Sequence, residues 1–307
     1  MTTSRTILVT GVTGYLGSRL VPRLLDDGHT VRVLTRDAGK LVDHEWRDRV
    51  EVAEGDASSY DVLQRALDGV DVGYYLLHSM DGRPGFEQRD REMAATFARA
   101  AEDADVGRIV YMSGLHPEGE DLSAHLASRV EVGEIFLAAP VPAVVLQAAV
   151  ILGPGSASYE MLRHLTRRLP VMLAPKWLDN RIQPIAVSDV LHYLAAATDL
   201  PDDTNRTFDV GGPDVLTYRE MILRFAEVAG FGRRFVVTVP VLTPGLASLW
   251  VGLVTPIPSG LARPLVGSLV HEVVCREHDL DELVGPPPGG ARGYDESIAA
   301  AVTGKDP

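Results

Sequence analysis

The sequence is poor in cysteine and has no long uninterrupted apolar run. Its 307 residues include one cysteine, Cys275, so no internal disulfide can form, which favours a reducing compartment such as the cytoplasm. The longest charge-free stretch, 235–262, contains four prolines, and only eleven residues separate Pro244 from Pro256. A helix needs about 20 residues to cross a bilayer, so we expect no transmembrane helix. Arg5 is the only charged residue before the first apolar run, which leads directly into a glycine-rich loop, so we expect no signal peptide.

Basic residues are also scarce. Asp and Glu total 42 against 29 Lys and Arg, which gives a formal charge of −13. So acidic a surface repels phosphate backbones, and nucleic-acid binding is not expected. Apolar residues make up 46% and charged residues 23%, as in soluble globular proteins, which excludes a disordered chain or a disulfide-stapled miniprotein.

The first half of the chain alternates short apolar runs with amphipathic stretches. This alternation predicts an α/β fold with a doubly wound parallel sheet, because strands covered on both faces read as continuous apolar runs. The expected strands are Thr6–Val9, Val31–Thr35, Val50–Ala53, Val72–Leu77, Arg108–Met112 and Ala143–Gln147. The expected helices are Leu16–Leu25, Tyr60–Leu67, Glu87–Glu102 and Ala127–Leu137.

The pattern changes after about Gly153. We expect a loop over 169–184, with three prolines, and a helix over 189–197 that Ser188 or Asp189 caps. The other expected elements are helices at 159–168 and 218–229 and strands at 185–187 and 207–210. We therefore expect two parts, a larger one over 1–153, to which 182–200 returns, and a smaller C-terminal α+β region, 154–307.

The strongest motif is the glycine-rich loop after the first strand, which runs Gly11-Val12-Thr13-Gly14-Tyr15-Leu16-Gly17. A strand before it and a helix after it form the context of a dinucleotide-binding loop. Gly11 supplies the tight turn, Gly14 lets the diphosphate approach, and Gly17 allows close helix packing. Main-chain N–H groups at the start of the helix hold the diphosphate, so Thr13, Tyr15 and Leu16 also belong to the expected site.

The Gly-x-x-Gly-x-x-Gly spacing resembles the short-chain dehydrogenase/reductase superfamily, in its extended and atypical branches. Further family-like pieces follow in order: Gly55-Asp56-Ala57, Tyr111-Met112-Ser113-Gly114 and Gly153-Pro154-Gly155. The resemblance implies a Rossmann fold and a bound nicotinamide coenzyme. It also implies that Asp56 and Ala57 contact the adenine and that Ser113 belongs to the catalytic site. An Asp-type turn is the structural alternative for Asp56.

The end of the second strand decides between the two nicotinamide coenzymes. Arg36 stands there, where enzymes that use NAD often carry an acid. A guanidinium there can bind a 2′-phosphate through a charge-assisted hydrogen bond worth about 1.5–3 kcal/mol. We therefore expect NADP(H) rather than NAD(H), although the neighbouring Asp37 opposes this and Arg36 is otherwise a solvated loop residue.

The residues for hydride transfer depart from the family pattern. Such enzymes use Tyr-x-x-x-Lys, but none of the three lysines lies four residues after a tyrosine. His125 and Arg129 occupy that register after Ser113. Arg129 can hydrogen-bond ribose hydroxyls but stays protonated, and its charge lowers the pKa of His125. A neutral His125 can polarise a substrate oxygen but is a mediocre general acid. The structural alternative is that His125 only starts a helix and that Arg129 faces solvent.

Two further residues, His78 and Ser79, end the fourth strand. Ligands of open α/β sheets bind at the carboxyl ends of the strands, so both are candidates to approach the nicotinamide. A packed strand end is the alternative. No metal site is expected, because the other histidines are scattered and a single cysteine makes a thiolate site implausible.

The stretch 235–271 contains one charged residue, Arg263. Extended members of the superfamily build their substrate pocket from the C-terminal part, so the stretch favours an apolar small-molecule substrate over a sugar nucleotide. A core helix pair or a dimer face would give the same composition. A face resting peripherally on a membrane is a further alternative, which the scarcity of Lys and Arg within this stretch disfavours.

The leading interpretation is an NADP(H)-dependent oxidoreductase that reduces a carbonyl or unsaturated bond of an apolar molecule. The chain also resembles NmrA-like redox sensors and the NADPH-binding accessory subunit of respiratory complex I. A coenzyme-binding protein without turnover is therefore the first alternative, which the missing Tyr-x-x-x-Lys favours. An epimerase or isomerase is the second, and the oligomeric state stays open.

Overall fold

The structure, a computed structural model, describes residues 4–78, 85–119, 121–239, 267 and 270–304. Ser79 and most of the charge-poor stretch 235–271 lie outside these residues. The expectations for Ser79 and for the C-terminal pocket wall therefore stay predictions.

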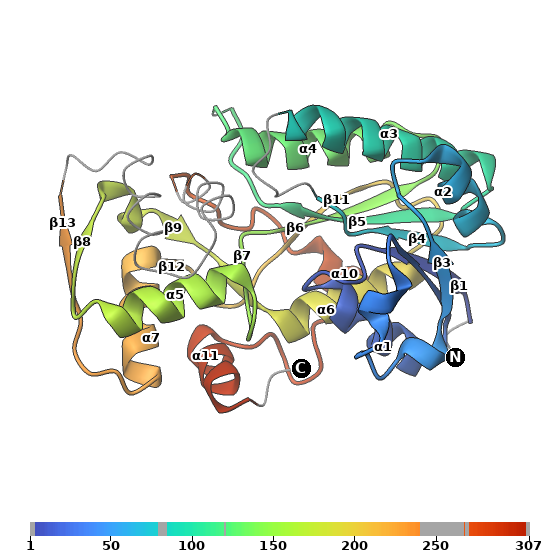
Figure 1. Cartoon of the computed structure of the whole chain (residues 1–307). Helices are drawn as coiled ribbons and strands as arrows, with labels where there is room; N and C mark the ends of the chain where they lie inside the picture. The colour runs from blue at the N-terminus through green and yellow to red at the C-terminus, as the bar shows by residue number, and fades with distance from the viewer. Residues whose placement is uncertain (1–3, 79–84, 120, 240–266, 268–269, 305–307) are drawn as a thin grey trace.

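A seven-stranded parallel sheet forms the larger part of the protein (Figure 1). The strand order is β3-β2-β1-β4-β5-β6-β11, so the chain winds outward from β1 first in one direction and then in the other. This order confirms the predicted doubly wound fold and places a switch point between β1 and β4, where such sheets bind ligands. The strands are β1 (Thr6–Thr10), β2 (Thr30–Thr35), β3 (Glu51–Glu54), β4 (Val72–Tyr75), β5 (Arg108–Gly114), β6 (Ala143–Ala148) and β11 (Arg206–Val210).

Helices cover both faces of this sheet, as Figure 1 shows. One face carries α1 (Gly17–Asp26), α6 (Val187–Ala196) and α10 (Asp279–Val284), and the other carries α2 (Tyr60–Leu67), α3 (Phe86–Asp103) and α4 (Ala124–Leu137). Successive strand residues point to opposite faces, so Leu8 and Tyr75 pack on the α3 side and Val9 and Tyr74 on the α1 side. Because both faces are buried, these strands contain few polar residues.

Two buried polar side chains attach the last turn of α6 and the segment after it to the sheet. The Tyr74 hydroxyl donates to the carbonyl oxygen of Leu194 at 2.6 Å. Arg108 is 1% exposed and donates to the carbonyls of Ala197, Thr198 and Pro201. Buried donors need such partners, so these contacts explain why α6 packs beside α1 although it follows the second half of the sheet.

The remaining elements form a smaller α+β part at one end of the sheet (Figure 1). Its core contains the buried rings of Tyr159, Phe225 and Tyr294. Its helices are α5 (Ala157–Arg168), α7 (Tyr218–Val228) and α11 (Tyr294–Thr303). Its strand pairs are β7 (Val150–Leu152) with β10 (Pro184–Ala186), β9 (Arg181–Ile182) with β12 (Leu216–Thr217), and β8 (Val171–Ala174) with β13 (Phe235–Thr238).

Two local expectations were wrong. The expected loop 169–184 contains β8, a 3₁₀ turn and β9, because β8 pairs with β13 some sixty residues later and its flanking prolines lie outside the paired residues. Helix α6 begins at Val187 after Ala186, so neither Ser188 nor Asp189 is the cap. The Asp189 carboxylate instead accepts a hydrogen bond from the Arg292 backbone at 2.7 Å.

Helix α4 begins three residues earlier than expected, and this shift matters for the site. Ser123 caps it by accepting a hydrogen bond from the Leu126 N–H at 3.4 Å. His125 therefore lies in the first turn of the helix and Arg129 one turn further along. Among the helices of the described residues, none is long and apolar enough to span a membrane.

Candidate functional site

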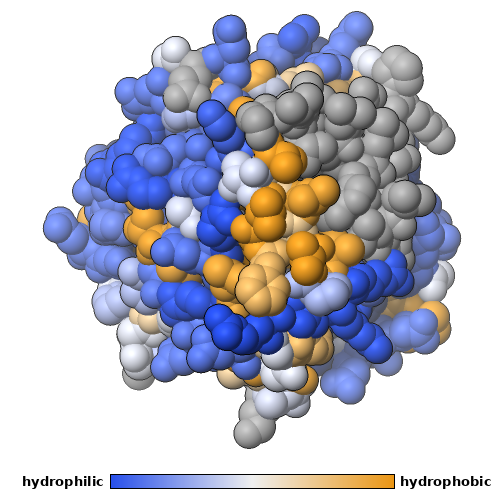
Figure 2. All heavy atoms as spheres, turned by 90° about the vertical axis from the view of Figure 1, so that its left-hand side faces the viewer, coloured by the Kyte–Doolittle hydropathy of each residue, from blue (hydrophilic) through white to orange (hydrophobic). Residues whose placement is uncertain are grey.

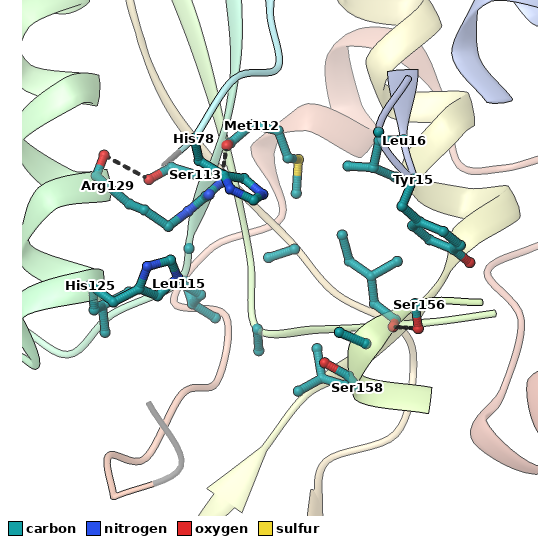
Figure 3. A pocket seen from close by; sticks show the side chains of 18 of the residues that line it. Tyr15, Leu16, His78, Met112, Ser113, Leu115, His125, Arg129, Ser156 and Ser158 are labelled. Carbon is teal, nitrogen blue, oxygen red and sulfur yellow. Dashed lines mark hydrogen bonds between the residues drawn. The ribbon is translucent and has the colours of Figure 1, made fainter. Parts of the chain in front are cut away.

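A cavity of about 290 Å³ lies at the carboxyl ends of β1, β4, β5 and β6, where the strand order reverses (Figure 3). The glycine-rich loop forms one wall and the start of α4 another. Apolar residues of β7 and α5 close the side toward the smaller part of the protein. The lining includes Gly11, Gly14, Tyr15, Leu16, Gly17, Leu76, Leu77, His78, Met112, Ser113, Leu115, His125, Arg129, Ile151, Ser156, Ser158, Met161, Leu162, Tyr218 and Val273.

The glycine-rich loop fits against β4 so closely that two of its positions exclude any side chain. Gly11 has a φ of +68°, and a Cβ there would lie 2.3 Å from the Leu76 carbonyl oxygen. A Cβ at Gly17 would lie 2.4 Å from the Gly11 carbonyl oxygen, which also accepts the Gly14 N–H at 2.9 Å. Thr10 adds a hydrogen bond between the ends of β1 and β4, since its hydroxyl donates to the Tyr74 carbonyl at 2.9 Å.

The same loop offers main-chain donors for an anion. The N–H groups of Thr13 and Leu16 have no acceptor within the described part of the chain, and α1 begins at Gly17. A Cβ at Gly14 would meet only the Gly11 oxygen, at 3.0 Å, so its outer side is open. Open N–H groups at the positive end of a helix dipole suit a diphosphate, so the loop fits the coenzyme that the sequence predicts.

Arg36 and Asp56 lie further along the same sheet edge, after β2 and β3. Arg36 is exposed, and within the described residues no hydrogen bond or ion pair holds its guanidinium. Asp56 accepts the Ser58 N–H at 2.8 Å, as an Asp-type turn does. Hydrogen bonds from Ser58, with the charge of Arg36 as a smaller cause, lower the pKa of Asp56. Asp37 accepts the Gly39 N–H at 2.9 Å, so its carboxylate serves the local turn.

A polar cluster forms the wall opposite the glycine-rich loop, as Figure 3 shows. Ser113, at the end of β5, is 3% exposed and donates to the Arg129 carbonyl at 3.2 Å. The Arg129 guanidinium donates to the Met112 carbonyl. His125 and His78 border the same cavity. The sequence-predicted residues Ser113, His125, Arg129 and His78 are thus brought together, with α4 fastened to the end of β5.

Both imidazoles of this cluster are neutral at physiological pH. Burial, then the charge of Arg129, and then His78 lower the pKa of His125 to about 3. Desolvation and then the charge of Arg129 lower the pKa of His78 to about 4, although the residue as a whole is exposed. A neutral imidazole offers one N–H donor and one acceptor nitrogen, so each ring can hydrogen-bond a ligand without carrying charge.

The wall formed by α5, β7 and Val273 was not predicted, because the charge-poor stretch 235–271 was expected to form the pocket. Tyr218, which lines the cavity at the start of α7, was not predicted either. Tyr218 is 4% exposed, and its hydroxyl has no hydrogen-bond partner in the described part of the chain. Locally its sequence reads only as the start of a capped helix, since Thr217 and Glu220 form a capping box.

Metal ligation has no support within the described residues, where no three His, Cys, Asp or Glu side chains cluster. The expected site residue Thr13 is exposed and does not line the cavity, but it belongs to the loop whose N–H groups are open. The roles of the individual site residues stay predictions.

Sequence comparison supports the nucleotide-binding assignment. Residues 11–138 match the family described as NAD(P)H-binding. The chain is 30% identical over 272 residues to a ceramide reductase of Caulobacter vibrioides, which covers 84% of this chain and 82% of the relative. The chain belongs to the atypical short-chain dehydrogenase/reductases. Its relatives are reductases of NmrA-like type, and its matched domain binds NAD(P)H, as the glycine-rich loop predicts.

The chain is also similar to a respiratory-chain protein and to solved reductase structures. Subunit 9 of the alpha subcomplex of mitochondrial NADH dehydrogenase (ubiquinone) from Rattus norvegicus is 24% identical over 80% of this chain and 65% of that protein. Two solved structures share the fold. Triphenylmethane reductase of Citrobacter sp. with NADP(H) has a TM-score of 0.74 at 20% identity, covering 96% of this chain and 99% of that one. An Escherichia coli NADPH-dependent quinone oxidoreductase with NADPH has a TM-score of 0.75 at 19% identity, covering 95% and 98%.

The depressed pKa of His125 predicts a loss of stability in mild acid. The unfolded chain binds a proton on this histidine below about pH 6.5, but the folded protein does not until about pH 3. The free energy of unfolding therefore falls as the pH drops through this window, by up to about 1.4 kcal/mol per pH unit. His125→Gln removes the titration, so the variant should gain about 1–2 kcal/mol relative to the wild type between pH 6.5 and 5.

Urea unfolding at several pH values measures this difference. His44→Gln, at a histidine that does not line the cavity, serves as the control and should follow the wild type. Parallel stability curves for the wild type and His125→Gln would contradict the prediction.

Proposed function

We propose that the protein is an NADP(H)-dependent oxidoreductase that reduces a carbonyl or unsaturated bond of an apolar small molecule. One observation carries the proposal: a single cavity joins the diphosphate-binding loop, the Ser113–His125–Arg129 cluster and an apolar wall from α5 and β7. Two relatives support a reductase: the ceramide reductase of Caulobacter vibrioides and a furanyl-methyl phosphate reductase of Streptomyces griseus.

The coenzyme spans the sheet edge in this proposal. The loop 11–17 holds the diphosphate, Asp56 and Ala57 lie near the adenine, and Arg36 selects the 2′-phosphate. The two solved structures that contain NADP(H) or NADPH support this preference by analogy of fold. When bound, the coenzyme supplies a hydride. We further propose that residues 1–153, with 182–200, form the coenzyme domain and that 154–307 form the substrate region.

The polar cluster orients the oxygen of the substrate. Neutral His125 donates an N–H hydrogen bond to the carbonyl oxygen, and Arg129 stabilises the negative charge that hydride transfer would leave there. Because Arg129 keeps its proton, the proton that completes the alcohol would come from the His125 N–H, which water would then reprotonate. The Ser113 hydroxyl donates to the Arg129 carbonyl, so its oxygen is oriented to accept rather than to donate. A weak acid typically costs about 10²–10⁴-fold in rate, whereas positioning supplies about 7–11 kcal/mol. A slow or specialised reductase fits these magnitudes.

A coenzyme sensor without turnover is the second candidate. The missing Tyr-x-x-x-Lys and the similarity to a respiratory-chain subunit favour it. An epimerase of sugar nucleotides fits less well, because the cavity side toward α5 presents Met161, Leu162 and Ile151 where a sugar needs hydrogen-bonding groups.

Coenzyme consumption with quinones, enones and lipophilic ketones tests the proposal. We expect substrate-dependent oxidation of NADPH that is faster than that of NADH. His125→Phe should reduce the rate by about 10²-fold or more while the NADPH dissociation constant stays within twofold or so. Tight NADPH binding with no turnover on any substrate would favour the sensor, and unchanged turnover of His125→Phe would exclude its role.

Tyr218 should contribute a hydrogen bond to the substrate, because its phenol is buried beside the cavity without a partner in the described part of the protein. Tyr218→Phe should raise the KM for an oxygen-bearing substrate by about threefold to tenfold and leave NADPH affinity unchanged. Tyr75→Phe is a matched control, since Tyr75 is 1% exposed and does not line the cavity. Equal effects of the two substitutions would contradict a substrate contact.

A further inference from the structure

The two-stranded ribbon of β8 and β13 exposes a row of large apolar side chains. Val171, Leu173 and Phe235 are 56%, 55% and 55% exposed, and Val237 is 48% exposed. These four account for close to half of the ten exposed large apolar side chains in the described residues. Figure 2 shows apolar side chains gathered on this side of the molecule, with hydrophilic ones to the left of them and below. We name these four residues the apolar face.

The inner face of the ribbon already has its packing partners. Met172 and Ala174 alternate with the exposed residues of β8 and are buried in the core around α5 and α7. A ribbon with one buried face normally carries polar residues on the other, so an apolar outer face is not needed for folding. The apolar face is therefore a surface that becomes buried when the protein binds another apolar phase.

Basic residues border the apolar face. Residues 161–176 and 229–239 contain six Arg and Lys but no Asp or Glu, in a chain with 42 acids and 29 bases. The strands are parallel, so their first residues, Val171 and Phe235, pair at one end of the ribbon. Arg167, Arg168 and Arg233 precede these ends and are exposed. The Arg233 guanidinium lies 5.9 Å from the centre of the Phe235 ring.

We propose that this surface docks on an anionic phospholipid bilayer. Apolar side chains rimmed by Arg and Lys match the acyl and headgroup layers of an anionic leaflet, and exposed phenylalanine favours that boundary. A second copy of the chain fits less well, since it brings the same basic rims together. The stretch 235–271 has a single cation, Arg263, which argued against membrane contact, but the fold places Arg167, Arg168 and Lys176 on the segments that flank β8, the partner of β13.

Vesicle flotation tests this surface without reference to enzymatic activity. The full chain should float with vesicles of equal parts phosphatidylcholine and phosphatidylglycerol, should not float with phosphatidylcholine alone, and should dissociate in high salt. Leu173→Ser with Phe235→Ser, and separately Arg167→Glu with Arg233→Glu, should each lower the partition coefficient by at least about tenfold.

Val42→Ser with Val302→Ser is the matched control, because these side chains are 67% and 48% exposed outside the ribbon. The melting temperature and the NADPH dissociation constant of each variant are measured first, and only variants that match the wild type in both are compared by flotation. Equal flotation of control and ribbon variants, or no flotation of the wild type, would overturn the proposal. A dimer that light scattering detects and that Leu173→Ser dissociates would instead assign the apolar face to a second copy.

Discussion

The structure depends on the close approach of one backbone turn to the end of one strand. The carbonyl groups of Gly11 and Leu76 occupy the space that side chains at Gly17 and Gly11 would need. This contact fixes where α1 begins and leaves N–H groups of the loop open at the sheet edge. The site for an anion is therefore a consequence of packing between β1, α1 and β4, and not of any charged side chain.

The opposite wall of the cavity combines one fixed charge, on Arg129, with two neutral histidines. Arg129 is attached to β5 through the Met112 carbonyl, and its charge together with desolvation keeps His125 and His78 unprotonated. Arg129 stays protonated, unlike the Lys of the Tyr-x-x-x-Lys motif, which can lose its proton. The hydrogen-bond donors of this wall therefore keep the same protonation state near neutral pH. In the proposed reaction the coenzyme would supply the hydride, and the residues of this wall would supply position and a largely apolar surrounding.

Local patterns predicted most of the coenzyme half. The apolar runs and glycine spacing placed β1 to β6 and α1 to α4 to within a few residues, because both depend on neighbouring residues alone. The ribbon of β8 and β13, the Asp189 contact with the Arg292 backbone and the position of Tyr218 beside the cavity were missed. Each of these features depends on segments far apart in the chain. The prolines on both sides of β8 also made its sequence resemble a loop.

The central claim is that the glycine-rich loop binds the diphosphate of a nicotinamide coenzyme through open main-chain N–H groups. Calorimetric titration of the wild type and of Gly14→Val with NADPH tests it most directly, with circular dichroism to check the fold of the variant. The account predicts one coenzyme bound per chain and a loss of binding of about 10²-fold or more when a branched side chain covers the N–H groups, since one buried charge-assisted contact is worth about 1.5–3 kcal/mol. Equal binding by a folded Gly14→Val protein, or no binding by the wild type, would contradict it.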